Sequence, residues 1–289
     1  MSGPLRYCGR DFSQADLEVI SDLIAVHPTR QAIADAVCEA LEWYRPDGRK
    51  KDMSARVALL RMDRDGLITL PKPLHRNGNG RITRYAEPFA ELPLAFVGSL
   101  QALGPIELVI ANTKAAKLRW RSLIASYHYL GYNTFAGAQM RYLIESSSGT
   151  IGAIGFAASA WSCAPRDNYI GWDKATRETR LHLVVGNARF LILPQVRVAN
   201  LASYILSRVA RRLPSDWQLA YGYQPVLLET FVESARFTGA SYRAANWLHV
   251  GQTKGRGKLD RYNQYALPVK DVYLYPLHRD YRRILASPE

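Results

Sequence analysis

The chain has 289 residues, of which 48% are apolar, with 17 Tyr and 6 Trp; this is enough core material for two domains and excludes a solvated tail. Its 38 Lys and Arg outnumber 25 Asp and Glu, and the resulting net charge of +13 makes polyanions the natural partners. Because we find no long apolar stretch, no signal peptide and no CxxC pair among the three cysteines, we expect a cytoplasmic protein without membrane contact or structural zinc.

The first part of the chain predicts three helices and a strand. The segments are, in chain order, SQADLEVISDLIAV capped by Ser13, RQAIADAVCEALEW, the turn YRPDGRKKD, DMSARVALLRMDRDG and the strand GLITLP. Three helices followed by a strand are typical of a helix-turn-helix or winged-helix module. We therefore predict a helical DNA-binding domain over residues 1–72, with a plain helical bundle as the alternative.

Positive charge gathers around the third predicted helix. Residues 45–84 hold 11 Lys or Arg against 4 Asp or Glu. Cations at the start of a recognition helix neutralise DNA phosphates. The residues we expect to grip duplex DNA are Arg49, Lys50, Lys51 and Arg56, and the alternative is an ordinary solvated face.

Proline and glycine mark a boundary after this domain. Residues 73–105 predict a linker with one short helix, and residues 106–289 predict a second domain in which strands and helices mix. Its segments predict a helix in LRWRSLIASYHYLGY, a hairpin in QMRYLIES and TIGAIGFAASAW, and a long helix in VRVANLASYILSRVARRL. Strands are predicted in TRLHLVVGNARFLILP, WQLAYGY, PVLLETFV and RYNQYALPVKDVYLYPL. The fold class is thus α/β (α+β).

Several long motifs resemble the DruA family, which is named for the Druantia anti-phage defence system. They are YHYLGY at 127–132, RDNYIGW at 166–172, NARFLILPQVRVANLAS at 187–203, LLETFV at 227–232 and YRAANWLHVGQTKGRG at 242–257. The resemblance covers nearly the whole chain. It implies action on foreign or mobile DNA, because some relatives belong to defence islands and others accompany transposases.

The order of elements in the second domain is also similar to the acyltransferase fold of the GNAT group. In that group glycines and an arginine cradle a pyrophosphate at a helix start. The matching segment here, VRVANLAS, has no glycine, which argues against acetyl-coenzyme A as a cofactor. The fold likeness leaves open a DNA-base-modifying enzyme on this scaffold.

Three polar residues of the second domain are candidates for catalysis. His128 in YHYLGY fits a general base or a packed helix end, and Glu229 after PVLL fits a functional carboxylate or a buried salt bridge. Asp167 in RDNYIGW, with Glu229, could bind Mg²⁺ in a nuclease, or could pair with Arg166 in a loop.

A glycine-rich basic segment near the C-terminus predicts a second contact with DNA. Arg243, Lys254 and Arg256 lie in YRAANWLHVGQTKGRGK, where glycines permit close approach of the backbone and cations neutralise phosphates. The alternative is a surface hairpin with solubilising charges. Tryptophans of this domain could stack on a flipped base or pack in the core.

Three functions remain open from the sequence. The first is a protein that binds double-stranded DNA and processes or senses it in anti-phage defence or transposition. The second is an enzyme on DNA, either a metal-dependent nuclease or strand-transfer accessory, or a base modifier. The third is an adaptor that recruits a helicase or transposase.

Overall fold

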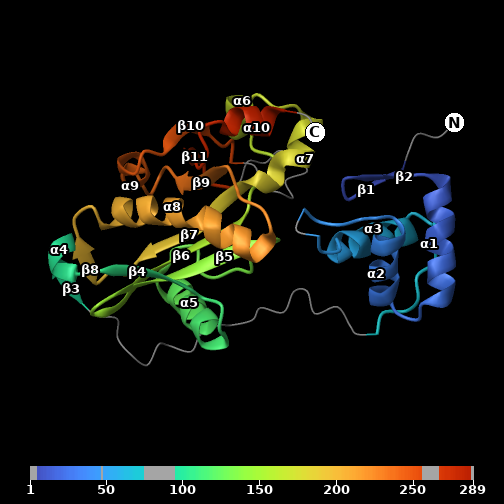
Figure 1. The fold of residues 1–289 in the computed structure, drawn as a ribbon, viewed down its shortest axis with the longest axis horizontal. Coiled ribbons are helices and arrows are strands. Elements are labelled where there is room, and N and C mark those ends of the chain that lie inside the picture. The colour runs from blue at the N-terminus through green and yellow to red at the C-terminus, as the bar shows by residue number, and fades with distance from the viewer. Residues whose placement is uncertain (1–4, 47, 75–94, 256–266, 288–289) are drawn as a thin grey trace. The chain divides into compact units, whose positions relative to one another are not determined.

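The computed structural model describes residues 5–46, 48–74, 95–255 and 267–287 (Figure 1). The chain divides into two compact units, Met1–Thr83 and Arg84–Glu289. Within the described residues, no helix has the length and apolar composition needed to cross a membrane.

The first unit is a β-hairpin followed by three helices. Its elements are β1 (Leu5–Tyr7), β2 (Arg10–Phe12), α1 (Gln14–Val26), α2 (Arg30–Ala40) and α3 (Asp52–Arg64). Ser13 caps α1 as predicted, because its hydroxyl accepts the Asp16 N–H while the Asp16 carboxylate accepts the Ser13 N–H. Thr29 caps α2 by accepting the N–H of Ala32. The three predicted helices are therefore confirmed.

Every element of this unit contributes to one hydrophobic core. Helix α3 buries one side only, formed by Ala55, Ala58, Leu59 and Met62. These positions follow the spacing of three and four residues that places side chains on one face of a helix. The opposite face of α3 is consequently left to solvent.

The strand predicted in GLITLP does not form. Residues 68–73 have no regular structure, and no strand follows α3 before residue 75, where the described part of this unit ends. Leu70 N donates to the Asp63 carboxylate, and Arg30 Nε donates to the carbonyl of Pro71, so the chain returns along α3 and α2. The apolar pattern that suggested a strand serves to bury Ile68. Only the helices of the expected winged-helix module are seen.

The second unit is built on a seven-stranded sheet with the order β10-β11-β9-β7-β6-β5-β4. Neighbouring strands are antiparallel except for the parallel pair β7 and β9. The strands are β4 (Ile106–Ile110), β5 (Gln139–Ser146), β6 (Gly149–Ala158), β7 (Val184–Ile192), β9 (Leu227–Glu233), β10 (Leu248–Gln252) and β11 (Lys270–Pro276). The expected α/β domain with a mixed sheet is confirmed.

A separate parallel pair and several helices complete this unit. The pair is β3 (Phe96–Gly98) and β8 (Val196–Val198). The helices are α4 (Leu100–Leu103), α5 (Lys114–Tyr127), α6 (Ala164–Ile170), α7 (Lys174–Arg180), the 3-10 turn η1 (Leu181–Leu183), α8 (Leu201–Tyr221), α9 (Ala240–Ala244) and α10 (Tyr281–Ala286).

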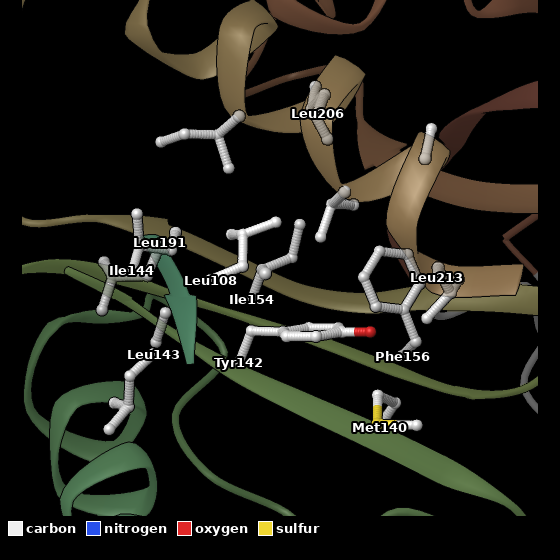
Figure 2. Packing of buried hydrophobic residues seen from close by; sticks show 14 of the residues in the cluster. Leu108, Met140, Tyr142, Leu143, Ile144, Ile154, Phe156, Leu191, Leu206 and Leu213 are labelled. Carbon is white, nitrogen blue, oxygen red and sulfur yellow. The ribbon is translucent and has the colours of Figure 1, made fainter. Parts of the chain in front are cut away.

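Helices α5 and α8 cover opposite faces of the sheet (Figure 1). On one face, Gly155 of β6 lies against Trp120 of α5, and a Cβ atom at this glycine would be 2.6 Å from the indole. On the other face, the Tyr142 hydroxyl of β5 donates to Asp216 of α8 at 2.8 Å. Figure 2 shows Tyr142 and its apolar neighbours facing the Leu206 and Leu213 side of α8. The main core thus has a layer on each side of the sheet.

Two segments differ from their predictions. WQLAYGY was predicted as a strand, but its first five residues are the end of α8, which continues through Pro214. Trp217 extends the buried stripe of α8 by one more turn and is fully buried, so packing keeps this segment helical. Within the predicted linker, α4 is the expected short helix, whereas β3 is a strand that was not predicted, and Leu103 of α4 enters the main core.

Candidate functional site

The parallel strands β7 and β9 separate after a short stretch of pairing. They pair at four positions, Val184–Asn187 with Leu227–Thr230. Beyond this point β7 stays beside β6 and β9 stays beside β11. Ala188 forms a bulge in β7, where the register with β6 shifts. Because each strand keeps its outer partner, a gap opens between the two.

A cavity of about 410 Å³ lies at this gap. Its volume falls within the range of about 300–1,000 Å³ that is usual for pockets binding small molecules. Four segments line it: Tyr127–Leu130 at the end of α5, Asn187–Ile192 of β7, Thr230–Val232 of β9, and Phe237–Tyr242 leading into α9. This cavity is our candidate functional site.

A closed hydrogen-bond network forms one wall of the cavity. The Tyr242 hydroxyl donates to Asn187 Oδ1 at 2.7 Å, and the Thr230 hydroxyl donates to the Asn187 carbonyl at 3.2 Å. Asn187 Nδ2 in turn donates to the carbonyls of Gly155 and Arg189. Burial raises the pKa of Tyr242 to about 12, so the phenol stays protonated at neutral pH. Asn187, Thr230 and Tyr242 thus bond to one another and to the main chain, and they hold β7 and β9 in place. Recognition of a ligand therefore depends on other residues of the cavity.

The structure places His128 at the end of α5, in the cavity lining. Its Nδ1 accepts the N–H of Leu130 at 3.2 Å, and its ring stacks on Tyr129 with centroids 5.0 Å apart. Burial, assisted by the charge of Arg189, lowers the pKa of His128 to about 4. At neutral pH the ring is therefore uncharged and carries its proton on Nε2. This tautomer offers a ligand a hydrogen-bond donor and occupies the basic nitrogen, which disfavours the predicted role of general base.

Arg189 is a cavity residue that the sequence did not single out as a site. Its Nε donates to the Gly131 carbonyl at 3.1 Å, and Nη1 donates to the Ala188 carbonyl at 2.7 Å. Among the described residues no carboxylate forms an ion pair with it. Burial lowers the pKa of its guanidinium, but arginine remains charged at neutral pH. The cavity wall thus carries a positive charge without a protein counterion in the part of the chain that is described.

Asp167 and Glu229 lie outside the cavity lining and share a buried arginine. Arg166 Nη1 donates to Glu229 Oε2 at 2.8 Å, and both side chains are fully buried. Arg166 Nε donates to Asp167 Oδ1 at 2.9 Å, and Arg177 pairs with the same carboxylate at 3.3 Å. Ala160 N donates to Glu229 Oε1 at 2.7 Å. This network ties α6 and the loop before it to β9.

This arrangement bears on the proposed metal site. Burial raises the pKa of Glu229, while Arg166 and the Ala160 N–H oppose that rise. The positive charge between the two carboxylates comes from Arg166, and in the described ranges no group of three His, Cys, Asp or Glu could hold a metal ion. The geometry therefore favours the alternatives given for Glu229 and Asp167, a buried salt bridge and a pair with Arg166.

The residues expected to grip DNA in the first unit have different environments. Arg49 is exposed, and Lys50 forms an ion pair with Glu39. Lys51 is half-buried just before α3, and burial lowers the pKa of its amine. Arg56 approaches Asp52 at 3.9 Å on the surface of α3.

The residues near the C-terminus that were predicted to contact DNA also have different environments. Arg243 donates to the carbonyl of Thr238 and, at 3.0 Å, to the Tyr273 hydroxyl, so it stabilises the approach to α9. Lys254 is exposed after β10, and Arg256 lies outside the described residues. Trp172 and Trp247 are buried in the core, as expected for most tryptophans, while Trp161 is exposed.

The solvent face of α3 extends beyond the residues that the sequence predicts to contact DNA. It presents Arg56, Arg61 and Arg64 along one side, together with the exposed apolar side chains of Met53 and Val57. Arg61 and Arg64 form no ion pair with the described residues. The helical spacing in DMSARVALLRMDR already contained this signal, since the arginines fall between the buried positions.

A family comparison covers most of the chain. The model of the family described as "Druantia protein DruA" matches residues 63–266. No curated protein matches the chain. Most of α3 and all of α1 and α2 lie before the matched region.

Solved structures similar to the chain include acetyltransferases. An N-acetyltransferase from Staphylococcus aureus Mu50 is 10% identical, with a TM-score of 0.36 over 60% of this chain and 99% of that one. A GNAT-family acetyltransferase described as putative, from Desulfovibrio desulfuricans, is 9% identical, with a TM-score of 0.36 over 60% and 100%. Aminoglycoside acetyltransferase AAC(6')-Ib is 12% identical, with a TM-score of 0.40 over 60% and 95%.

Proposed function

This chain belongs to the DruA family, which supports a role in defence, and we propose that it binds double-stranded DNA through the solvent face of α3. The observation that carries the proposal is the row of arginines on that face, Arg56, Arg61 and Arg64. Its position outside most of the matched region makes this an argument from the geometry of α3, separate from the family.

The composition of this face suits the major groove of DNA. An α-helix fits that groove, where arginines reach phosphates or guanine edges and apolar side chains contact thymine methyl groups. Arg61 and Arg64 can meet phosphates without first breaking an ion pair to a described residue. The opposite face of α3 is fixed in the core by Leu59 and Met62, so the arginines are held on a rigid element.

The proposal is tested by replacing two arginines of α3. We expect the double variant R61Q/R64Q to bind a short duplex more weakly, because two phosphate contacts are lost. The logarithm of the binding constant should also depend less steeply on salt, by about 1.8 units of slope for two contacts. Fluorescence anisotropy with a labelled duplex at several salt concentrations gives both quantities.

A matched control removes the same charge elsewhere. Arg279 and Arg283, beside and within α10 of the second unit, are highly exposed, so R279Q/R283Q lowers the net charge equally. This control should keep the wild-type slope. If both double variants show the same slope, α3 does not contact DNA and the proposal fails.

A further inference from the structure

The cavity between β7 and β9 has an aromatic wall. Tyr129 packs against Phe237 with ring centroids 5.1 Å apart, and Arg236 lies 4.6 Å from the centre of the Tyr129 ring. Phe237 lines the cavity and is 45% exposed, so this aromatic cluster reaches the mouth of the cavity. Exposed aromatic rings beside a pocket are platforms on which flat aromatic ligands stack.

The hydrogen-bond donors of the cavity that remain available to a ligand indicate its chemical class. Asn187, Thr230 and Tyr242 satisfy one another, as described above. His128 Nε2 has no hydrogen-bond partner among the described residues, and Arg189 keeps donors beyond its two bonds to carbonyls. Both are donors, and one is a cation. The ligand should therefore combine an aromatic ring with hydrogen-bond acceptors and a negative charge.

We propose that this cavity binds one nucleotide, with its base against the exposed ring of Phe237 and its phosphate at Arg189. Two sources supply this chemistry: a free mononucleotide, or a nucleotide extruded from a DNA strand. Extrusion is easiest at a mismatched pair, where less pairing energy is lost. The inference is separate from the contact of α3 with DNA and does not require it.

The test measures binding of free nucleotides and of DNA by the full chain. Calorimetry with each of the four deoxynucleoside monophosphates probes the first source. Anisotropy with a duplex carrying a central mismatch, compared with the matched duplex, probes the second. Binding of a monophosphate assigns a free nucleotide, and preference for the mismatch assigns an extruded one.

Substitutions in the cavity identify where binding occurs. Arg189→Met should weaken whichever signal is present by about 10- to 100-fold, because a charged hydrogen bond to phosphate is lost. Phe237→Ala should weaken it by about tenfold through lost stacking, and the partial exposure of Phe237 makes this variant safe for folding. Arg208→Met on the solvent side of α8 removes the same charge and should change nothing.

Three results would overturn the proposal. They are the absence of both signals, equal effects of R189M and R208M, and an unchanged signal in F237A. The variant R61Q/R64Q separates this site from α3, because it should weaken binding of any duplex while leaving monophosphate binding, or the ratio of mismatched to matched affinity, at the wild-type value.

Discussion

Glu229→Gln removes one negative charge from the buried network that joins β9 to Arg166 of α6, and it keeps the volume of the side chain. The wild-type carboxylate accepts hydrogen bonds from Arg166 at 2.8 Å and from Ala160 N at 2.7 Å, and neither charged side chain reaches solvent. Breaking a buried pair costs about 3–5 kcal/mol, because the remaining charge is left in the interior. Since Asp167 still compensates Arg166, we expect the lower end, about 3 kcal/mol.

Urea unfolding followed by tryptophan fluorescence measures this loss. Five of the six tryptophans lie in the second unit, so the signal reports mainly on that unit. Glu233→Gln at the partly exposed end of the same strand is the matched control and should cost no more than about 0.5 kcal/mol. A cost below about 1 kcal/mol for E229Q would refute the structural role. Lost activity on DNA with unchanged stability would instead restore the catalytic hypothesis for Glu229.

Two further predictions concern stability. The pKa of His128 is lowered to about 4, below its value in the unfolded chain, so the unfolded state binds more protons and stability falls as pH drops from about 6.5 towards 4. After allowance for partial exposure of the ring, wild type should lose about 1–2 kcal/mol more than His128→Gln between about pH 7 and about pH 5, and equal losses in urea unfolding would contradict this. Gly152→Ala should cost about 1–3 kcal/mol, because its Cβ would lie 2.3 Å from the Leu191 carbonyl oxygen. Gly186→Ala, with its nearest neighbouring atom at 3.7 Å, should unfold at a higher urea concentration than G152A, and the reverse order would refute the steric argument.

Local signals allowed the longer helices, α1, α2, α3, α5 and α8, and the strands β5, β6, β7, β9 and β11 to be predicted. The Ser13 cap, the apolar spacing of α1 to α3 and the turn residues between β5 and β6 all act within a few residues. WQLAYGY was misassigned because its aromatic and β-favouring residues follow Pro214, which usually ends a helix. In the fold, Trp217 packs in the core and the Tyr221 hydroxyl bonds to the backbone of Gln139, so tertiary contacts decide its structure.

The candidate site was predictable only in part. His128 was identified from its motif, but its tautomer depends on the Leu130 N–H, and its charge state depends on burial and on Arg189, sixty-one positions away. The sequence offered Asp167 and Glu229 as metal ligands because it could not show that Arg166 lies between them. The cavity itself arises where two strands diverge, and such a gap leaves no pattern in the residues that line it.

The divergence of β7 and β9 has a consequence for the evolution of this protein. The opening is set by the main chain, since β9 stays paired with β11, and β7 stays paired with β6 on both sides of its bulge. Side chains at the mouth of the cavity, such as Phe237, therefore do not hold the sheet together. A defence protein is under pressure to follow changes in its target, and here new binding preferences can be acquired by substitution at the mouth while the scaffold is inherited unchanged.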